Sequence, residues 1–247
     1  TNTIGDSNIA IGYSALLYNT ANYNIAIGHG ALLYNTIGYG NIGLGYLSLY
    51  RNTEGSYNYS AGLNSLETNT VGNNNTAIGY KALHQNTSGT GYLGDDGCNN
   101  TAIGYEALLN SLDGQNNIAV GLQSGYSNTT GDDNIFQGYQ AGYNLTTGNY
   151  NVFQGYQSGY YNVGWNNVAL GNEALHGDNI NNASGEYNIG IGYKTGYVLK
   201  LGYSNILIGE LSGSTISDGY TNTIVGYNCG NNIVNGWENS IFGYSSG

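Results

Sequence analysis

Few side chains capable of catalysis are present, and they lie far apart. The three histidines, His29, His84 and His176, stand at unrelated places in the sequence pattern. None is spaced with a Ser, Cys or Asp as a nucleophile and its base would be, and no metal-ligand spacing is found. The glycines recur periodically instead of clustering before a helix, as a phosphate-binding loop requires. We therefore expect no enzymatic activity, no metal ion and no cofactor.

Two cysteines and two aspartate pairs remain as candidate ligands. Cys98 and Cys229 lie seven repeats apart, roughly 34 Å at one strand spacing per repeat, which is beyond disulfide reach. We expect Cys229 to be a small buried residue and Cys98 to be a free thiol, with pairing between chains as the alternative. Asp95–Asp96 and Asp132–Asp133 could bind calcium, but the calcium-binding nonapeptide repeat is absent, which favours solvated charge.

Composition excludes several classes of protein. Fifteen acidic and four basic residues give a net charge of −11, which repels nucleic acid and anionic membranes. No apolar stretch is long enough to span a membrane, and no leader segment is recognisable. The 26 tyrosines argue against disorder, and the lack of proline excludes collagen. The chain begins inside a repeat and has no Met, so we expect it to be part of something longer.

A nine-residue phrase, clearest as NTAIGYKAL at residues 75–83, organises the whole chain. Of the thirteen steps between its copies, nine are 17 residues, two are 16, and the others are 25 and 21. A short fixed period predicts a solenoid whose units bury apolar surface only by stacking. The phrase begins at Asn8, Asn24, Asn41, Asn58, Asn75, Asn100, Asn117, Asn134, Asn151, Asn167, Asn188, Asn205, Asn222 and Asn239.

We number the positions of the phrase as slots from this asparagine. Slots 2 and 4 are mostly β-branched or aliphatic, which predicts a strand of about four residues with both slots facing the interior. Slot 1 should form a hydrogen-bonded asparagine ladder, with a ligand-binding row as the alternative. The invariant glycine of slot 5 requires a positive φ or a close backbone approach. Representative ladder positions are Asn75, Asn100, Asn117, Gly79, Gly104 and Gly121.

Slot 3 should then face outward, yet it too is apolar. Because a strand that is apolar on both sides is buried on both sides, we expect slot 3 to contact a second copy of the chain. The candidate contact residues are Phe136, Phe153, Leu207, Ile224 and Ile241.

Slot 6 is tyrosine in nine copies, which predicts a stacked structural ladder. The same row could instead bind sugars or a partner, because the faces of phenol rings suit pyranose rings. The candidate residues of such a strip are Tyr80, Tyr105, Tyr139 and Tyr156.

These patterns predict an all-β protein: one parallel β-solenoid domain over residues 1–247, with about 14 coils of roughly 17 residues. Insertions near residues 90–99 and 176–182 should emerge as loops. A second copy placed tail to head would continue the register, with a step of 247 − 239 + 8 = 16 residues. We therefore expect either a longer fibre or end-to-end stacking.

The phrase N-x-A-I-G-x-x-A with Gly- and Asn-rich connectors resembles the head repeats of trimeric autotransporter adhesins. It is also similar to NTAIGYxAL repeats of some bacteriophage tail fibres. The resemblance covers essentially the whole chain. It implies a left-handed parallel β-roll, three chains side by side, placement outside the cell or on a virion, and attachment to a surface or receptor.

The leading functional hypothesis is thus a non-enzymatic extracellular fibre component that assembles with itself, laterally or end to end. Its partners would be copies of itself, with surface glycans or a receptor as possible additions, and neither nucleic acid nor membrane insertion is expected. The alternative is a receptor- or glycan-binding tail-fibre segment or adhesin head. A lesser alternative is ice binding, for which no repeated Thr-x-Thr row is present.

Overall fold

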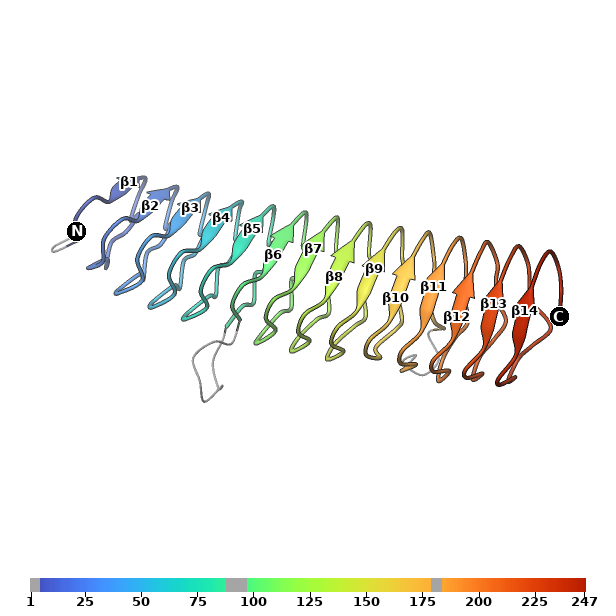
Figure 1. The fold of residues 1–247 in the computed structure, drawn as a ribbon. Helices are drawn as coiled ribbons and strands as arrows, with labels where there is room; N and C mark the ends of the chain where they lie inside the picture. Colours follow the sequence, from blue (N-terminus) through green and yellow to red (C-terminus); the bar gives the residue numbers. More distant parts are fainter. Residues whose placement is uncertain (1–4, 88–96, 179–183) are drawn as a thin grey trace. The chain divides into compact units, whose positions relative to one another are not determined.

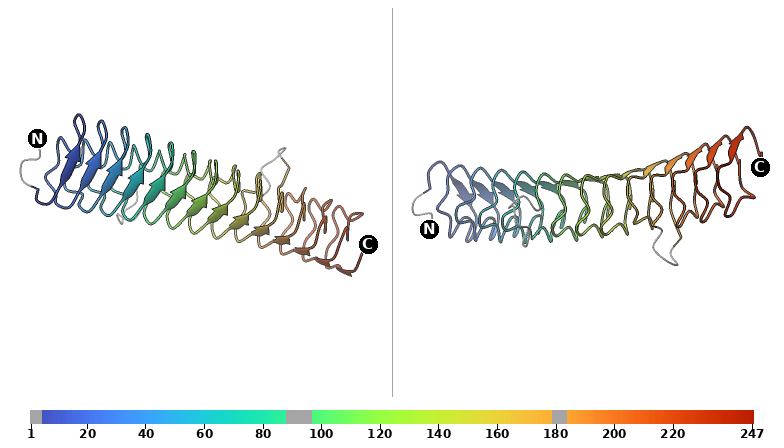
Figure 2. Two further views of the ribbon diagram at one scale, coloured as in Figure 1. Left: turned by 90° about the horizontal axis from the view of Figure 1, so that it is seen from above. Right: turned by 60° about the horizontal axis from the view of Figure 1, so that its bottom comes forward.

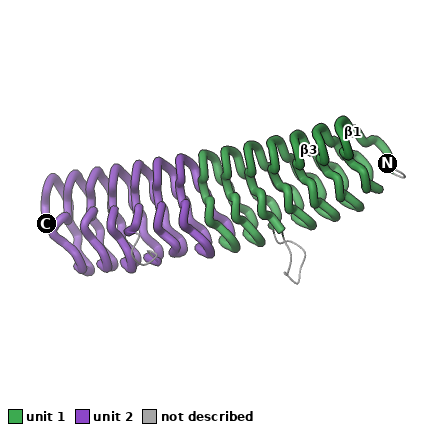
Figure 3. Tube along the Cα trace, turned by 180° about the vertical axis from the view of Figure 1, so that it is seen from behind, with its two compact units in different colours: residues 1–131 green, residues 132–247 purple. Residues whose placement is uncertain are grey.

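The computed structural model describes residues 5–87, 97–178 and 184–247, which divide into two compact units. Unit 1 comprises Thr1–Gly131 and unit 2 comprises Asp132–Gly247 (Figure 3). Each is described here by itself, so a single uninterrupted array stays a prediction. Most of each expected insertion, at residues 88–96 and 179–183, lies outside the described residues.

Unit 1 is a parallel β-solenoid with one three-residue strand in each coil (Figure 1). Each strand pairs with the strand of the next coil, and equal slots lie opposite each other, as at Ala77, Ala102 and Ala119. The strands are β1 (Ile9–Ile11), β2 (Ile25–Ile27), β3 (Ile42–Leu44), β4 (Tyr59–Ala61), β5 (Thr76–Ile78), β6 (Thr101–Ile103) and β7 (Ile118–Val120).

Unit 2 repeats this architecture. Its strands also pair in parallel and in register, and they lie along one side of the coils (Figure 2). The strands are β8 (Ile135–Gln137), β9 (Val152–Gln154), β10 (Val168–Leu170), β11 (Ile189–Ile191), β12 (Ile206–Ile208), β13 (Thr223–Val225) and β14 (Ser240–Phe242). The all-β parallel solenoid with a spacing near 17 residues is therefore confirmed.

Four turn positions with positive φ recur in every coil. In the coil that begins at Asn75 these are Asn74 (57°), Gly79 (131°), Lys81 (50°) and Leu83 (51°). A left-handed residue reverses the chain within one or two residues, so the coil closes on itself without a helix or a long loop. Among the described residues no helix could cross a membrane.

The direction in which the strands face is the reverse of what we expected. Slot 3 is buried, as at Ala77 and Ala102, whereas the flanking Ile78 and Ile103 of slot 4 are exposed. The reason lies in slot 1, whose asparagine side chains are themselves buried. Because side chains alternate along a strand, slots 1 and 3 share the interior and slots 2 and 4 face outward. The expectation that slots 2 and 4 fill the core was wrong.

The candidate contact residues need the same correction. Phe136, Phe153, Leu207 and Ile224 have no exposed surface, and Ile241 in the last coil is only partly exposed. Phe136 and Phe153 pack against each other inside unit 2, with ring centroids 6.1 Å apart. These slot 3 side chains therefore fill the core of their own chain and do not form a surface for a second copy.

Candidate functional site

The asparagines of slot 1 form the expected hydrogen-bonded ladder. The backbone N–H groups of Asn75, Asn100 and Asn117 each donate to the side-chain oxygen of the slot 1 asparagine one coil earlier, at 2.9 Å. Each side-chain NH₂ group in turn donates to the carbonyl of a glycine in the connector at the end of the same coil, such as that of Gly114 at 2.7 Å from Asn100 Nδ2. The buried amides are thus used by the backbone, which favours a structural role over a ligand-binding row.

The slot 5 glycines show both expected features, a positive φ and a close approach of the neighbouring backbone. Gly79, Gly104 and Gly121 have φ values of 131°, 140° and 138°. A Cβ atom at Gly104 would lie 2.3 Å from the carbonyl oxygen of Gly121 in the next coil. No side chain fits there, and the stacking distance of the coils depends on this close approach.

The outward side of each sheet is a flat, uncharged surface, here called the sheet face and formed by slots 2 and 4. Ile11 is 58% exposed and Ile103 is 37% exposed, and Ile27 and Ile78 are also exposed. The fourteen copies supply 14 × 2 = 28 such positions, and none holds Asp, Glu, Lys or Arg. In unit 1 slot 4 is aliphatic in every coil, whereas β8 and β9 of unit 2 carry Gln137 and Gln154.

The slot 6 tyrosines stack as predicted and remain exposed. The ring centroids of Tyr80 and Tyr105 are 5.0 Å apart, and those of Tyr139 and Tyr156 are 5.2 Å apart, with planes within 20° of parallel. All four rings are exposed. Partial desolvation of the Tyr105 phenol, followed by the nearby carboxylate of Glu106, raises its pKa. The rows are therefore structural ladders that also present ring surface to solvent.

Slot 10 and the connectors carry further aromatic rows whose stacking we did not predict. In unit 2, Tyr143, Tyr160, His176 and Tyr197 stack in one row, with centroids 4.8–5.3 Å apart. Burial between its neighbours lowers the pKa of His176. Tyr203, Tyr220 and Trp237 form another row, two residues before successive slot 1 asparagines. The stacking of these rows could have been predicted from the sequence, because their aromatic residues recur at the coil spacing.

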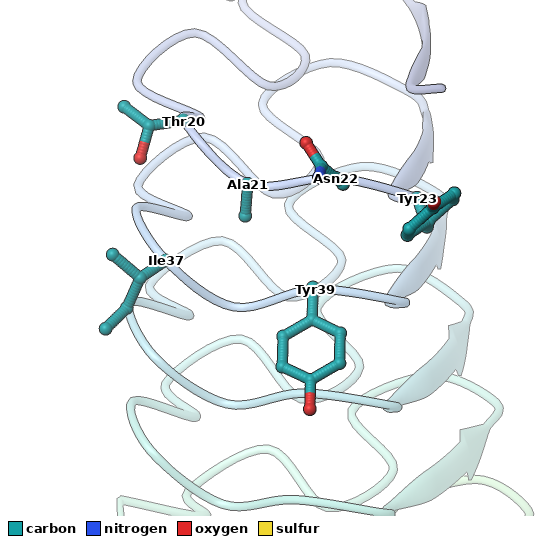
Figure 4. Close-up of a pocket in the computed structure, with 6 residues that line it drawn as sticks. All are labelled: Thr20, Ala21, Asn22, Tyr23, Ile37 and Tyr39. Atoms are coloured by element: carbon teal, nitrogen blue, oxygen red, sulfur yellow. The ribbon is translucent and has the colours of Figure 1, made fainter. Parts of the chain in front are cut away.

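Two of the shallow pockets in unit 1 lie near its connectors. One has a volume of about 330 Å³ and is lined by Thr20, Ala21, Asn22, Tyr23, Ile37 and Tyr39. Figure 4 shows Thr20 and Ile37 projecting from neighbouring turns while the ring of Tyr39 lies over the next coil. None of its lining side chains is charged. The other pocket, of about 410 Å³, is lined by Tyr34, Tyr50, Arg51, Thr53 and Thr70.

Within residues 5–87, 97–178 and 184–247, the His, Cys, Asp and Glu side chains do not gather into a metal-binding cluster. No cluster of three His, Cys, Asp or Glu side chains that could hold a metal ion occurs in the described part of the chain, which includes Asp132–Asp133 but not Asp95–Asp96. Cys98 and Cys229 are both buried, as expected for Cys229, and they do not form a disulfide with each other. Cys229 Sγ contacts the carbonyl oxygen of Gly243 at 2.7 Å. The absence of catalysis stays a prediction.

The comparisons with known proteins leave function to be argued from this geometry. The chain matches no protein family model, no curated protein and no solved structure at a significant level. The resemblance to adhesin and tail-fibre repeats therefore extends, as a finding, only to the repetitive parallel β-solenoid.

Proposed function

We propose that this protein is a non-enzymatic component of an extracellular fibre and that copies of it associate laterally through their sheet faces. The observation that carries the proposal is the composition of the sheet face: apolar and exposed in most coils, and uncharged in all of them. In a chain with a net charge of −11, the charged residues are placed elsewhere on the coil.

An exposed surface of this kind favours a covering partner. Soluble proteins rarely leave a long contiguous apolar patch in water. The backbone hydrogen bonds of β2 through β6 are satisfied by their neighbours in the sheet. A partner on this face would therefore contact side chains such as Ile27 and Ile103 by packing, and it would not need to extend the sheet.

A second copy of the chain is the partner whose spacing fits best. The side chains of the sheet face repeat at one strand spacing, about 4.8 Å, along the stack of coils. A surface with another repeat would fall out of step after a few coils. A copy has the same repeat by construction, so its isoleucines can interdigitate along the length of a unit. Because neither face is charged, the contact also avoids bringing acidic side chains together.

Sedimentation velocity of a paired variant tests this proposal. We expect Ile27→Glu with Ile103→Glu to shift the protein to the monomer, because each introduced carboxylate would be desolvated in the contact. The matched control is Ile37→Glu, which changes an isoleucine that is 61% exposed on a connector turn. A wild-type protein that sediments as a monomer, or a paired variant that assembles like the wild type, would contradict the proposal.

Glycan attachment is a second candidate function, favoured by the exposed stacked rings of Tyr80, Tyr105, Tyr139 and Tyr156. A glycan array tests it. Binding should weaken when Tyr80 and Tyr105 are replaced by serine, and a flat response over the array would remove this candidate.

A further inference from the structure

We propose that the pocket around Arg51 binds a sugar acid, that is, a pyranose ring carrying a carboxylate, as found in acidic polysaccharides. The pocket lies where the regular repeat is interrupted. Slot 11 holds Tyr18 and Tyr34 in two successive coils and Arg51, the only arginine of the chain, in the third. This inference does not depend on the lateral assembly proposed above, because the pocket is built entirely within unit 1.

The aromatic side chains give the pocket a floor and a wall. The rings of Tyr18 and Tyr34 stack in parallel, with centroids 5.4 Å apart and an interplanar angle of 10°. Tyr50 instead stands edge-on to Tyr34, with centroids 5.1 Å apart and an angle of 83°. The slot 11 stack ends at Tyr34, because Arg51 occupies that slot in the next coil. Tyr34, Tyr50 and Arg51 line a pocket of about 410 Å³, within the usual range for small-ligand sites. A flat aromatic face beside a perpendicular ring suits a pyranose.

Arg51 gives the pocket a positive charge that forms no ion pair with a carboxylate of the described residues. Among the described residues, Lys194 pairs with Glu173 at 3.3 Å and Lys200 pairs with Asp178 at 2.8 Å. Lys81 lies over the ring of Tyr80. Arg51 has no such ion pair within the described ranges, and the side chain of Glu67 in the next coil contacts His84 at 3.0 Å. An unpaired guanidinium in an acidic chain is suited to a bidentate contact with a ligand carboxylate.

The hydroxyl groups of the pocket suit the remaining groups of a sugar. Thr53 and Thr70 donate their hydroxyl hydrogens to backbone carbonyls of the next coil, at 3.1 and 2.7 Å. Their oxygen lone pairs stay available as acceptors for the O–H groups of a ligand. A sugar acid can use the ring face, the acceptors and the guanidinium together, whereas a peptide carboxylate would use chiefly the last.

Calorimetric titration with trigalacturonate and its fully methyl-esterified form tests the proposal, because the two differ in charge but share one carbohydrate scaffold. We expect the acid to bind about tenfold more tightly than the ester, the ratio that one charge-assisted hydrogen bond supplies. Arg51→Gln should remove that difference, and Tyr34→Leu should weaken binding of both forms. The matched control is Lys81→Gln, which removes a cation beside another exposed tyrosine and should change the affinity less than about twofold.

Four outcomes would overturn the proposal: no binding by the wild type up to about 10 mM, equal affinity for acid and ester, an equal loss in Lys81→Gln, or equally tight binding of a tripeptide carboxylate. Circular dichroism would show that each variant is folded. Sedimentation separates this inference from the proposed assembly, because Arg51→Gln should assemble like the wild type and the Ile27→Glu, Ile103→Glu variant should still bind the sugar.

Discussion

The two units fill the same coil in opposite ways. In unit 1 slot 3 is small, as at Ala77 and Ala102, and slot 9 is a buried leucine in six of the seven coils, as at Leu83 and Leu108. The seventh coil has Gly125 in slot 9. In most coils of unit 2 slot 3 is large, as at Phe136, and slot 9 is glycine. Slot 9 has positive φ in both units, so the backbone is the same and only the source of the buried volume differs.

The choice between a large residue at slot 3 and a large residue at slot 9 has a steric cause within the coil. A Cβ atom at Gly142 would lie 2.4 Å from Cδ1 of Phe136, so a leucine in that slot 9 could not coexist with this ring. One coil of unit 2 reverts to the pattern of unit 1: Ala169 occupies slot 3 and Leu175 occupies slot 9. A Cβ atom on Gly190 in the next coil would then lie 2.7 Å from Cγ of Leu175. In most coils one of the two slots is thus large and the other small, whereas Ala119 with Gly125 and Gly190 with Gly196 combine two small residues.

Slot 12 also differs between the two units. In unit 1 it holds a second asparagine ladder, in which Asn52 Nδ2 donates to Asn35 Oδ1 at 2.7 Å and to the carbonyl oxygen of Gly55 at 2.8 Å. In unit 2 the corresponding positions include the buried apolar side chains of Leu145, Leu199 and Ile216. Where slot 12 is asparagine, as at Asn52, the connector glycine carbonyl accepts two side-chain hydrogen bonds. At Leu145, Leu199 and Ile216 an apolar side chain is buried in place of the second donor.

The largest loss of stability is expected when a large side chain is removed from the core of unit 2. Phe136→Ala should lower the free energy of unfolding by about 3–5 kcal/mol, because it removes a fully buried ring. Adding Gly142→Leu converts the coil to the unit 1 pattern and should recover about half of that loss. Urea unfolding measures both, and hydrogen exchange at β8 and β9 locates the change.

Phe242→Ala is the control for this pair, since that phenylalanine is 65% exposed and should matter little. A double variant no more stable than Phe136→Ala would show that the two slots are not interchangeable.

The slot 1 asparagines should matter in both units, but by different amounts. Asn41 and Asn205 each accept the next backbone N–H, at 2.9 and 3.0 Å, and each donates to a glycine carbonyl at 2.8 Å. The carbonyl of Gly55 has a second donor in Asn52, whereas the slot 12 residue facing Gly219 is Ile216. Asn41→Ala should therefore cost about 2 kcal/mol and Asn205→Ala about 3 kcal/mol.

Urea unfolding of the two alanine variants, each compared with the wild type, measures this difference. Equal losses in the two units would mean that the second asparagine ladder does not support the glycine carbonyls.

A smaller effect concerns pH and is expected only in unit 2. His176 lies between Tyr160 and Tyr197, and burial lowers its pKa below the unfolded value of about 6.5. The unfolded chain therefore takes up the proton first, so stability is fully present above pH 6.5 and falls as the pH drops towards the lowered pKa. His176→Tyr keeps the stacked row and should melt with less dependence on pH between 7.5 and 5 than the wild type. An unchanged dependence would assign the effect to other groups.

The smallest change in stability is expected on the sheet face. Gln154→Ile gives β9 of unit 2 the aliphatic slot 4 found in unit 1 and should alter the free energy of unfolding by no more than about 0.5 kcal/mol. The same variant should strengthen lateral association, which sedimentation velocity would detect. Unchanged association would restrict the proposed contact to other parts of the face.

The coil spacing, a short strand at the start of each coil, the asparagine ladder and the corner glycines could all be predicted from the sequence. These features depend on backbone requirements that recur at one spacing, so every copy of the repeat carries the same type of residue at the same slot. Gly79 needs its left-handed backbone, and Asn75 needs a neighbour one coil away, whatever the rest of the coil contains. Stacking at tyrosine slot 6 follows from the same repetition.

The inward direction of the strand, the candidate contact surface and the pocket were decided only by the tertiary structure. Slots 2, 3 and 4 are all apolar, so their hydrophobicity does not indicate which side of the strand faces the core. The alternation is set by Asn75, and because this residue is polar, hydrophobicity does not predict that it is buried. Phe136 therefore lies in the core and Ile27 at the surface. The unpaired state of Arg51 likewise depends on which side chains the coils bring together, because a charge is neutralised by neighbours in space and not by neighbours in sequence.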